Sequence, residues 1–184
     1  MVYAVTGHRP EKIGGYGKEA KVHLEQFAIE TLRKIKPQAT RIFTGMALGW
    51  DQAIADACIR LNIPFVAAVP FPGQEMVWFE EMRVHYCYLL GKAQIVQMVS
   101  PGPYSKEKMQ IRNQFIVNEC EALIALWNGT TGGTCNCVKY AQEEQKKVIN
   151  VWDKWVTFLS IKEKEYGDKR RLRIEEKRKG QGHI

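Results

Sequence analysis

Three segments of the 184-residue chain combine an apolar run, a turn that contains glycine, and polar residues suited to binding an anion. They span Val2–Pro10, Arg41–Arg60 and Leu123–Thr134. Glycine allows the backbone to come close to a ligand, and the free N–H groups at the start of a helix favour a phosphate. The chemistry that these segments predict is the binding of a nucleotide or of another ligand that carries a phosphate.

The first segment ends in the turn Thr6-Gly7-His8-Arg9-Pro10. Arg9 follows the glycine, so we expect it to project from the carboxyl edge of a sheet. There it acts either as a phosphate clamp or in an ordinary surface ion pair. Gly7 and His8 are expected at the same site, and His8 is also a candidate, weaker than Arg9 as a phosphate ligand, for a general acid or base.

The second segment places Gly45 and Gly49 just before Asp51, where a helical pattern begins. Both glycines either line the pocket or only satisfy unusual backbone dihedral angles. Asp51 suits the N-cap of a helix, and its carboxylate is also able to accept ribose hydroxyls. The third segment carries Gly132-Gly133-Thr134, a further turn expected at the ligand.

The spacing of apolar residues predicts alternating strands and helices along most of the chain. Strands are expected near residues 2–6, 42–43, 64–69, 94–99, 122–127 and 148–152, and helices near residues 18–36, 51–62, 75–90, 106–120 and 135–145. Repeated β–α units with right-handed crossovers form a three-layer α/β/α sandwich around a mostly parallel sheet. Such folds bind ligands at the carboxyl ends of their strands, so we expect the three turns to meet there.

The composition is that of one folded domain. With 45% hydrophobic residues, a chain of this length buries one substantial core. We find no apolar run of about 18 residues, so we expect no membrane span. We also expect no secretory signal, because the N-terminus enters a strand-like segment at once.

The five cysteines predict neither disulfides nor a metal centre. Only Cys135 and Cys137 are closely spaced, and no second Cys or His pair completes a zinc set. Scattered thiols of odd number fit a reducing cytoplasm. We therefore predict a cytoplasmic protein without a metal or a cofactor.

The net charge of +7 is concentrated at the C-terminus, where residues 162–184 contain nine Lys and Arg against five Asp and Glu. We therefore divide the chain into a ligand-binding domain, residues 1–158, and a basic extension, residues 159–184. The extension is either a solvated, helical tail or a weak contact site for nucleic acid.

The order of the motifs also resembles a known superfamily. TGMALGWDQAIADA, residues 44–57, resembles the glycine turn of DprA-type proteins, and Arg112–Val117 resembles the Arg-Asn helix of that superfamily. Gly132–Thr134 lies where a further Gly-Thr turn is expected, and the opening TGHRP resembles the YpsA-like branch. On these motifs the chain is identified as a member of the SLOG superfamily, which includes DprA and the LOG enzymes. The resemblance covers residues 2–152 and implies a Rossmann-like fold.

The resemblance also implies roles for two neighbouring residues on the helix near residues 106–120. Asn113 is expected to bind the ligand, because the start of its helix faces the same edge as the three turns. Arg112 is expected either to bind the ligand or to be structural.

One departure from the pattern bears on catalysis. LOG-type phosphoribohydrolases carry a glutamate two or three residues after the Gly-Thr turn, and a carboxylate there stabilises positive charge on the ribose. In this chain Cys135-Asn136-Cys137 follows the turn, and the next acid is Glu143. Asp51 and Glu75, both at expected helix starts, are the remaining candidates for a catalytic carboxylate.

Three functions follow from these patterns. The first is a binding protein for a nucleotide or nucleotide-derived ligand, which senses or sequesters it. The second is a divergent nucleoside 5′-monophosphate N-glycosidase, and the third is a single-stranded nucleic-acid-binding protein of the DprA kind. Relatives often pair through helices, so the aromatic-rich segment from Trp78 to Tyr88 is a candidate face for a homodimer.

Overall fold

The structure is a computed structural model that describes residues 1–180, with side chains described for residues 1–168. The strands are β1 (Val2–Gly7), β2 (Arg41–Thr44), β3 (Phe65–Val69), β4 (Ile95–Met98), β5 (Ala122–Leu126) and β6 (Lys147–Asn150). The helices are the 3-10 turn η1 (Pro10–Lys12), α1 (Lys18–Ile35), α2 (Trp50–Leu61), α3 (Glu80–Lys92), α4 (Lys106–Asn118), α5 (Gly133–Glu143) and α6 (Trp152–Gly180).

The six strands form one sheet in the order β4-β3-β2-β1-β5-β6, and every neighbouring pair is parallel. This arrangement confirms the Rossmann-like α/β fold and the mostly parallel sheet. The chain builds outward from β1 to β4 and then returns to place β5 on the other side of β1. The strand order therefore reverses between β1 and β5, and a crevice opens at the carboxyl ends of strands at such a point.

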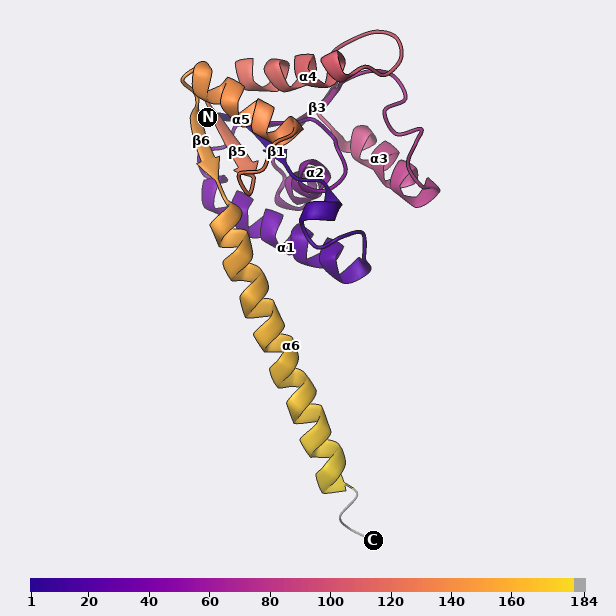
Figure 1. Cartoon of the computed structure of the whole chain (residues 1–184), viewed down its shortest axis with the longest axis vertical. Helices are drawn as coiled ribbons and strands as arrows, with labels where there is room; N and C mark the ends of the chain where they lie inside the picture. The colour runs from indigo at the N-terminus through magenta and orange to yellow at the C-terminus, as the bar shows by residue number, and fades with distance from the viewer. Residues whose placement is uncertain (181–184) are drawn as a thin grey trace. The chain divides into compact units, whose positions relative to one another are not determined.

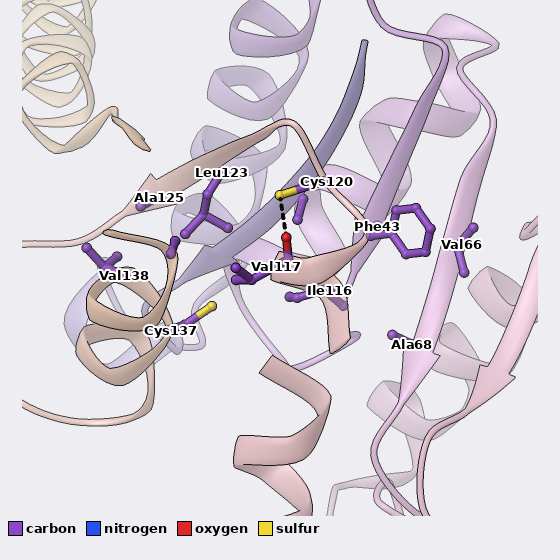
Figure 2. Packing of buried hydrophobic residues seen from close by; sticks show 12 residues of the cluster. Phe43, Val66, Ala68, Ile116, Val117, Cys120, Leu123, Ala125, Cys137 and Val138 are labelled. Carbon is purple, nitrogen blue, oxygen red and sulfur yellow. Dashed lines mark hydrogen bonds between the residues drawn. The ribbon is translucent and has the colours of Figure 1, made fainter. Parts of the chain in front are cut away.

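Helices cover both faces of the sheet (Figure 1), with α1 and α2 packed together on one face and α4 and α5 on the other. Figure 2 shows apolar side chains of β2, β3 and β5 gathered against Ile116 and Val117 of α4 and Val138 of α5. Strands β3 and β5 are buried at every position, as the continuous apolar runs Phe65–Val69 and Ala122–Leu126 require. The two-sided burial holds the carboxyl ends of the inner strands in place.

The third long helix begins later than its apolar spacing indicates. Residues 73–78 form turns, with the Trp78 N–H bonded to the Glu75 carbonyl, and α3 starts at Glu80 after an extended Phe79. The expected start near residue 75 is therefore wrong, because Pro72 and Gly73 lead into local turns that compete with the helix. Phe79, which precedes the helix, is 81% exposed.

The backbone separates into two compact units, Met1–Trp152 and Asp153–Ile184, of which residues 181–184 lie outside the described part. The second unit is helical as far as Gly180, which agrees with the expected helical tail over those residues. The sequence-based boundary after residue 158 stays a prediction. Within residues 1–180, no helix combines the length and the apolar character needed to cross a bilayer.

A test of the packing beneath the site is Gly7→Ala. A Cβ added at Gly7 would meet the Trp50 side chain at 2.5 Å, and Trp50 is fully buried. Overpacking of this kind destabilises a protein by roughly 1–3 kcal/mol. We expect urea unfolding of Gly7→Ala to show a loss in that range.

The matched control is Gly91→Ala on α3, where an added Cβ meets nothing within 4 Å. This change should be neutral or stabilising by up to about 1 kcal/mol, because Ala suits a helix better than Gly. Equal unfolding curves for the two variants would contradict the packing described for Gly7.

Candidate ligand-binding site

A pocket of about 380 Å³ lies at the point where the strand order reverses, at the carboxyl ends of β1 and β5. Residues from all three glycine turns and from α4 line it. The lining residues are Thr6, Gly7, His8, Arg9, Glu11, Lys12, Ala47, Asp51, Met109, Arg112, Asn113, Thr131, Gly132, Gly133 and Thr134. The tertiary structure thus brings together residues more than 120 positions apart.

The first turn is anchored to the end of β5 and to the third turn by two hydrogen bonds. The His8 N–H donates to the Leu126 carbonyl at 3.1 Å, and the Thr134 hydroxyl donates to the Gly7 carbonyl at 3.0 Å. Arg9 follows as an exposed residue in extended conformation (φ −74°, ψ 164°). Within residues 1–168 its guanidinium has no hydrogen bond or ion pair, so its donors are available to a ligand.

The third turn presents the start of α5 to the pocket. Its N-cap is Gly132, whose φ of 134° suits glycine and which offers no side chain to cap the helix. The first N–H of α5 that bonds back is that of Asn136, to the Gly132 carbonyl at 3.0 Å. The N–H groups before it are donors of the kind that bind anions.

The second turn is held by a buried ion pair between α2 and α4. The Arg112 guanidinium lies 3.8 Å from the Asp51 carboxylate and also donates to the Gly45 carbonyl. Asp51 accepts the Ala47 N–H at 3.3 Å. Both side chains are less than 8% exposed. Arg112 is therefore engaged in the structural role that was one of its two expected roles.

Burial raises the pKa of Asp51 to about 6, and the neighbouring Arg112 offsets part of this rise. Burial also lowers the pKa of Arg112, although a guanidinium stays charged at any physiological pH. Asp51 is thus ionised and paired at neutral pH. Its protonation in mild acid would leave Arg112 without its counter-charge.

Asn113, the next residue on α4, connects the same helix to the third turn. Its side-chain amide donates to the Gly133 carbonyl at 3.3 Å, and its oxygen accepts the Arg112 Nε–H at 3.1 Å. Two adjacent residues of one helix therefore hold two different turns. This arrangement fixes the width of the pocket.

A second network joins the first and third turns at the rim. The His8 ring lies 2.6 Å from the Asn128 side-chain oxygen, which accepts the Thr130 hydroxyl at 2.7 Å. Lys12 in turn donates to that hydroxyl at 2.7 Å. The pKa of His8 is lowered, first by burial and also by Lys12, so the imidazole is neutral at pH 7. His8 orders the rim and adds no charge to it.

Nine of the eleven residues expected at the ligand line this pocket, and Gly45 and Gly49 do not. Gly45 packs under Arg112, where only a hydrogen fits. Gly49 has a φ of 96° and lies against the His8 carbonyl, on the far side of the pocket wall. Gly49 thus has the unusual backbone angle that was one of its two expected roles, whereas Gly45 has no positive φ and is required for the close packing of Arg112.

The sequence patterns missed several lining residues, of which Lys12 and Glu11 carry charge. Both belong to η1, one turn after Arg9, so a wider window around the first glycine would have included them. The Tyr16 hydroxyl bonds to Glu11 at 2.5 Å and lowers the pKa of that carboxyl, which is therefore ionised. Glu11 and Asp51 are the two carboxylates that line the pocket.

Neither of the other acids considered for catalysis lines this pocket. Glu143 lines a groove that adjoins the pocket, and Glu75 lies in the turns before α3. Cys135 and Cys137 are buried in α5, and burial raises the pKa of Cys137 to about 12. Among the described side chains, no group of three or more His, Cys, Asp or Glu residues is arranged to hold a metal ion.

An open groove of about 790 Å³ continues from the pocket between α4 and α5. It shares Arg9, Met109, Asn113, Gly132 and Gly133 with the pocket. Further out it is lined by two lysines, two tyrosines and polar side chains, namely Tyr104, Lys106, Gln110, Gln114, Asn136, Lys139, Tyr140 and Glu143. A ligand longer than the pocket has room to extend along this groove.

The sequence profile of the YspA SLOG family matches residues 3–173. The SPbeta prophage-derived protein YoqJ of Bacillus subtilis is 33% identical over 125 residues, which cover 59% of this chain and 72% of that protein.

Two solved structures share the fold. DNA processing protein A (DprA) from Streptococcus pneumoniae aligns with a TM-score of 0.55 and 20% identity, over 79% of this chain and 48% of that one. DprA from Helicobacter pylori, described for its single-stranded DNA binding mode, aligns with a TM-score of 0.55 and 16% identity, over 80% and 63%. The chain thus spans about half the length of the first of these proteins and under two thirds of the second.

The buried pair predicts how stability depends on pH. The native pKa of Asp51, about 6, lies above the ordinary value of 3.8, so between these values the native state keeps a proton that the unfolded chain has lost. The contribution of Asp51 to the free energy of unfolding is therefore largest in acid and falls as the pH rises through about 6.

We expect the free energy of unfolding of the parent, minus that of Asp51→Asn, to fall by up to roughly 3 kcal/mol between about pH 4 and pH 7, at about 1.36 kcal/mol per pKa unit. Urea unfolding of both proteins across this range measures the difference. A difference that is flat or that rises with pH would contradict the raised pKa.

Proposed function

The chain belongs to the YspA SLOG family, whose profile matches residues 3–173, and we propose that it binds a ligand at the carboxyl ends of the strands of its sheet. Its pocket would hold the phosphate of a nucleotide or of a nucleotide-derived molecule. The biological role that we propose is that of a sensor or sequestering protein.

The observation that carries this proposal is that three glycine turns converge on one pocket. In this pocket the Arg9 guanidinium has no hydrogen bond or ion pair within residues 1–168. Arg112 is neutralised by Asp51 within the wall, so the charge offered to a ligand comes from Arg9 and Lys12, with Glu11 beside them. The start of α5, which has no side-chain cap and also lines the pocket, adds N–H donors. A phosphate is an anion that both the cationic side chains and the N–H donors are able to bind.

The same contacts favour binding over hydrolysis. An N-glycosidase needs a carboxylate beside the sugar to stabilise charge or to activate water. Asp51 is committed to Arg112 and to the Ala47 N–H, and Glu11 is bonded to Tyr16. We therefore expect nucleoside monophosphates to be recovered intact after incubation with the protein.

The direct test is Arg9→Ala. We expect its affinity for a nucleotide, identified by calorimetric screening of mono-, di- and cyclic nucleotides, to fall about 10- to 100-fold, as for a hydrogen bond to a charged group. Arg9→Lys should recover only part of the affinity, because an ammonium keeps the charge without the planar fork. Unfolding midpoints should stay within a small margin of the parent, since Arg9 is exposed.

The matched control is Arg33→Ala, which removes the same charge from an exposed position in the last turn of α1. Nucleotide affinity should not change in this variant. The proposal fails if no nucleotide binds the folded parent, and the assignment of Arg9 fails if Arg9→Ala binds as the parent does.

A second candidate function rests on the groove between α4 and α5. Its lysines would neutralise successive phosphates, and its tyrosines offer rings on which bases stack. Tyr104 is 61% exposed and so presents a ring to solvent. These features support binding of single-stranded nucleic acid with one phosphate in the pocket.

Contact of nucleic acid with the basic extension is an added proposal, and residues 181–184 of that extension lie outside the described part.

For this candidate we expect Lys106→Gln combined with Lys139→Gln to weaken binding of a single-stranded oligonucleotide. Log affinity decreases as log salt concentration increases, and this dependence should become less steep by about 1.4 in the double variant. Each lost phosphate contact reduces the steepness by about 0.7. A gel-shift titration over several salt concentrations gives this slope. Lys34→Gln on α1 is the control, and equal slopes for the parent and the double variant would exclude this groove as the binding surface.

Pairing of two copies also stays a proposal. The segment Trp78–Tyr88 does present apolar side chains to solvent, with Phe79 81%, Val84 65% and Tyr88 49% exposed. Such a patch suits an interface between protein surfaces.

A further inference from the structure

A second pocket, of about 180 Å³, lies behind the wall of the first. Pro10 and Gly49 line it, whereas Arg9 and Asp51 line the first pocket. Its other walls come from the loop before α1 and from helices α1, α2 and α3. The two pockets share no lining residue, so the second is a separate site.

Most of its surface is apolar. The apolar side chains that line it include Ile13, Leu24, Leu48, Ala53 and Met82. An apolar cavity of about 150 Å³ is large enough to bind benzene, so a single aromatic ring fits here. The ring would replace solvent against four different segments of the chain.

Acidic groups surround one side of this pocket. Asp56 on α2 accepts a hydrogen bond from the His85 ring on α3 at 2.9 Å, and its side chain is 15% exposed. Glu81, in the first turn of α3, is exposed and has no ion pair within residues 1–168. Glu25 on α1 is paired with Lys21 at 4.0 Å and with Arg60 at 3.6 Å.

The balance of charge therefore favours a positive ligand. Three carboxylates line the pocket against one lysine and one imidazole. Glu25 is paired with that lysine and with Arg60, and Asp56 with the imidazole, so the charge left unpaired among the described side chains is that of Glu81. An incoming ammonium would find Asp56 and Glu81 on the α2 and α3 side. An incoming carboxylate would meet like charge there, in a partly buried setting where screening is weak.

We propose that this pocket is a second ligand site, which binds a small organic cation made of one aromatic ring and a primary amine. The ring occupies the apolar part between α1 and α2, and the amine donates to the carboxylates of Asp56 and Glu81. The proposal of this site does not rest on nucleotide binding, because the two pockets have no lining residue in common.

Three probes with the same ring separate charge from shape: benzylamine, benzyl alcohol and benzoate. Titrations of the full chain followed by amide chemical shifts should show shifts at the pocket residues of the loop, α1, α2 and α3. We expect benzylamine to bind at least about tenfold more tightly than benzoate, with benzyl alcohol between them, as charge-assisted hydrogen bonds are the stronger kind.

Variants test the two halves of the site. Ala53→Leu fills the apolar part and should abolish binding of both benzylamine and benzyl alcohol. Should that variant fail to fold, Ala20→Trp at the half-buried rim on α1 closes the same space from outside. Asp56→Asn should weaken benzylamine about tenfold and change benzyl alcohol by less than about threefold.

Glu81→Gln should also weaken benzylamine selectively, whereas Glu30→Gln, an exposed glutamate on α1 outside the pocket, should not. Arg9→Ala should leave benzylamine affinity unchanged, which separates this site from the phosphate pocket. The proposal is overturned if none of the probes binds, if benzoate binds as tightly as benzylamine, or if filling the pocket leaves benzylamine affinity unchanged.

Discussion

The interaction on which the site depends is the buried contact of Arg112 with Asp51 and the Gly45 carbonyl. It joins α4, on one face of the sheet, to the turn that leads into α2 on the other. Removing one partner of such a pair is strongly destabilising, because the remaining charge is left buried without compensation. The pair therefore holds the second turn in one position, and neighbouring Asn113 extends the same constraint to the third turn.

This constraint also determines the charge that the pocket offers. Since Arg112 and Asp51 neutralise each other inside the wall, neither is free to dominate the field of the pocket. His8 is neutral and tied to Asn128, so it shapes the rim without charging it. The cationic groups that the pocket offers are Arg9 and Lys12, which are both exposed, and Lys12 donates a hydrogen bond to the Thr130 hydroxyl. The arrangement is suited to attracting an anion rather than to activating a nucleophile.

The position of the site follows from topology. The reversal of strand order between β1 and β5 separates α1 from α5 and leaves a crevice between their ends. The loop from Arg9 to Lys12 crosses this region and forms a wall with a pocket on each side. One side is polar and lies at the strand ends, and the other is apolar and lies among α1, α2 and α3. A single short segment thus separates two sites of different chemistry.

The sequence by itself determined the fold, the family and the order of the three turns. The fold and the turns follow from local patterns: continuous apolar runs for buried strands, helical spacing for the helices, and glycines at the turns. The family follows from the resemblance of the motifs to those of the SLOG superfamily. The start of α3 was the exception, because the turns at residues 73–78 override its apolar spacing. The binding roles of the site residues stay predictions.

Only the tertiary structure decided which residues share the pocket. Arg112 reaches a carbonyl 67 positions away, and the Thr134 hydroxyl reaches one 127 positions away. No periodicity encodes such contacts, because they depend on how strands are ordered and helices are packed. For the same reason Gly49 faces the second pocket while Lys12 faces the first, although the sequence had favoured the glycine.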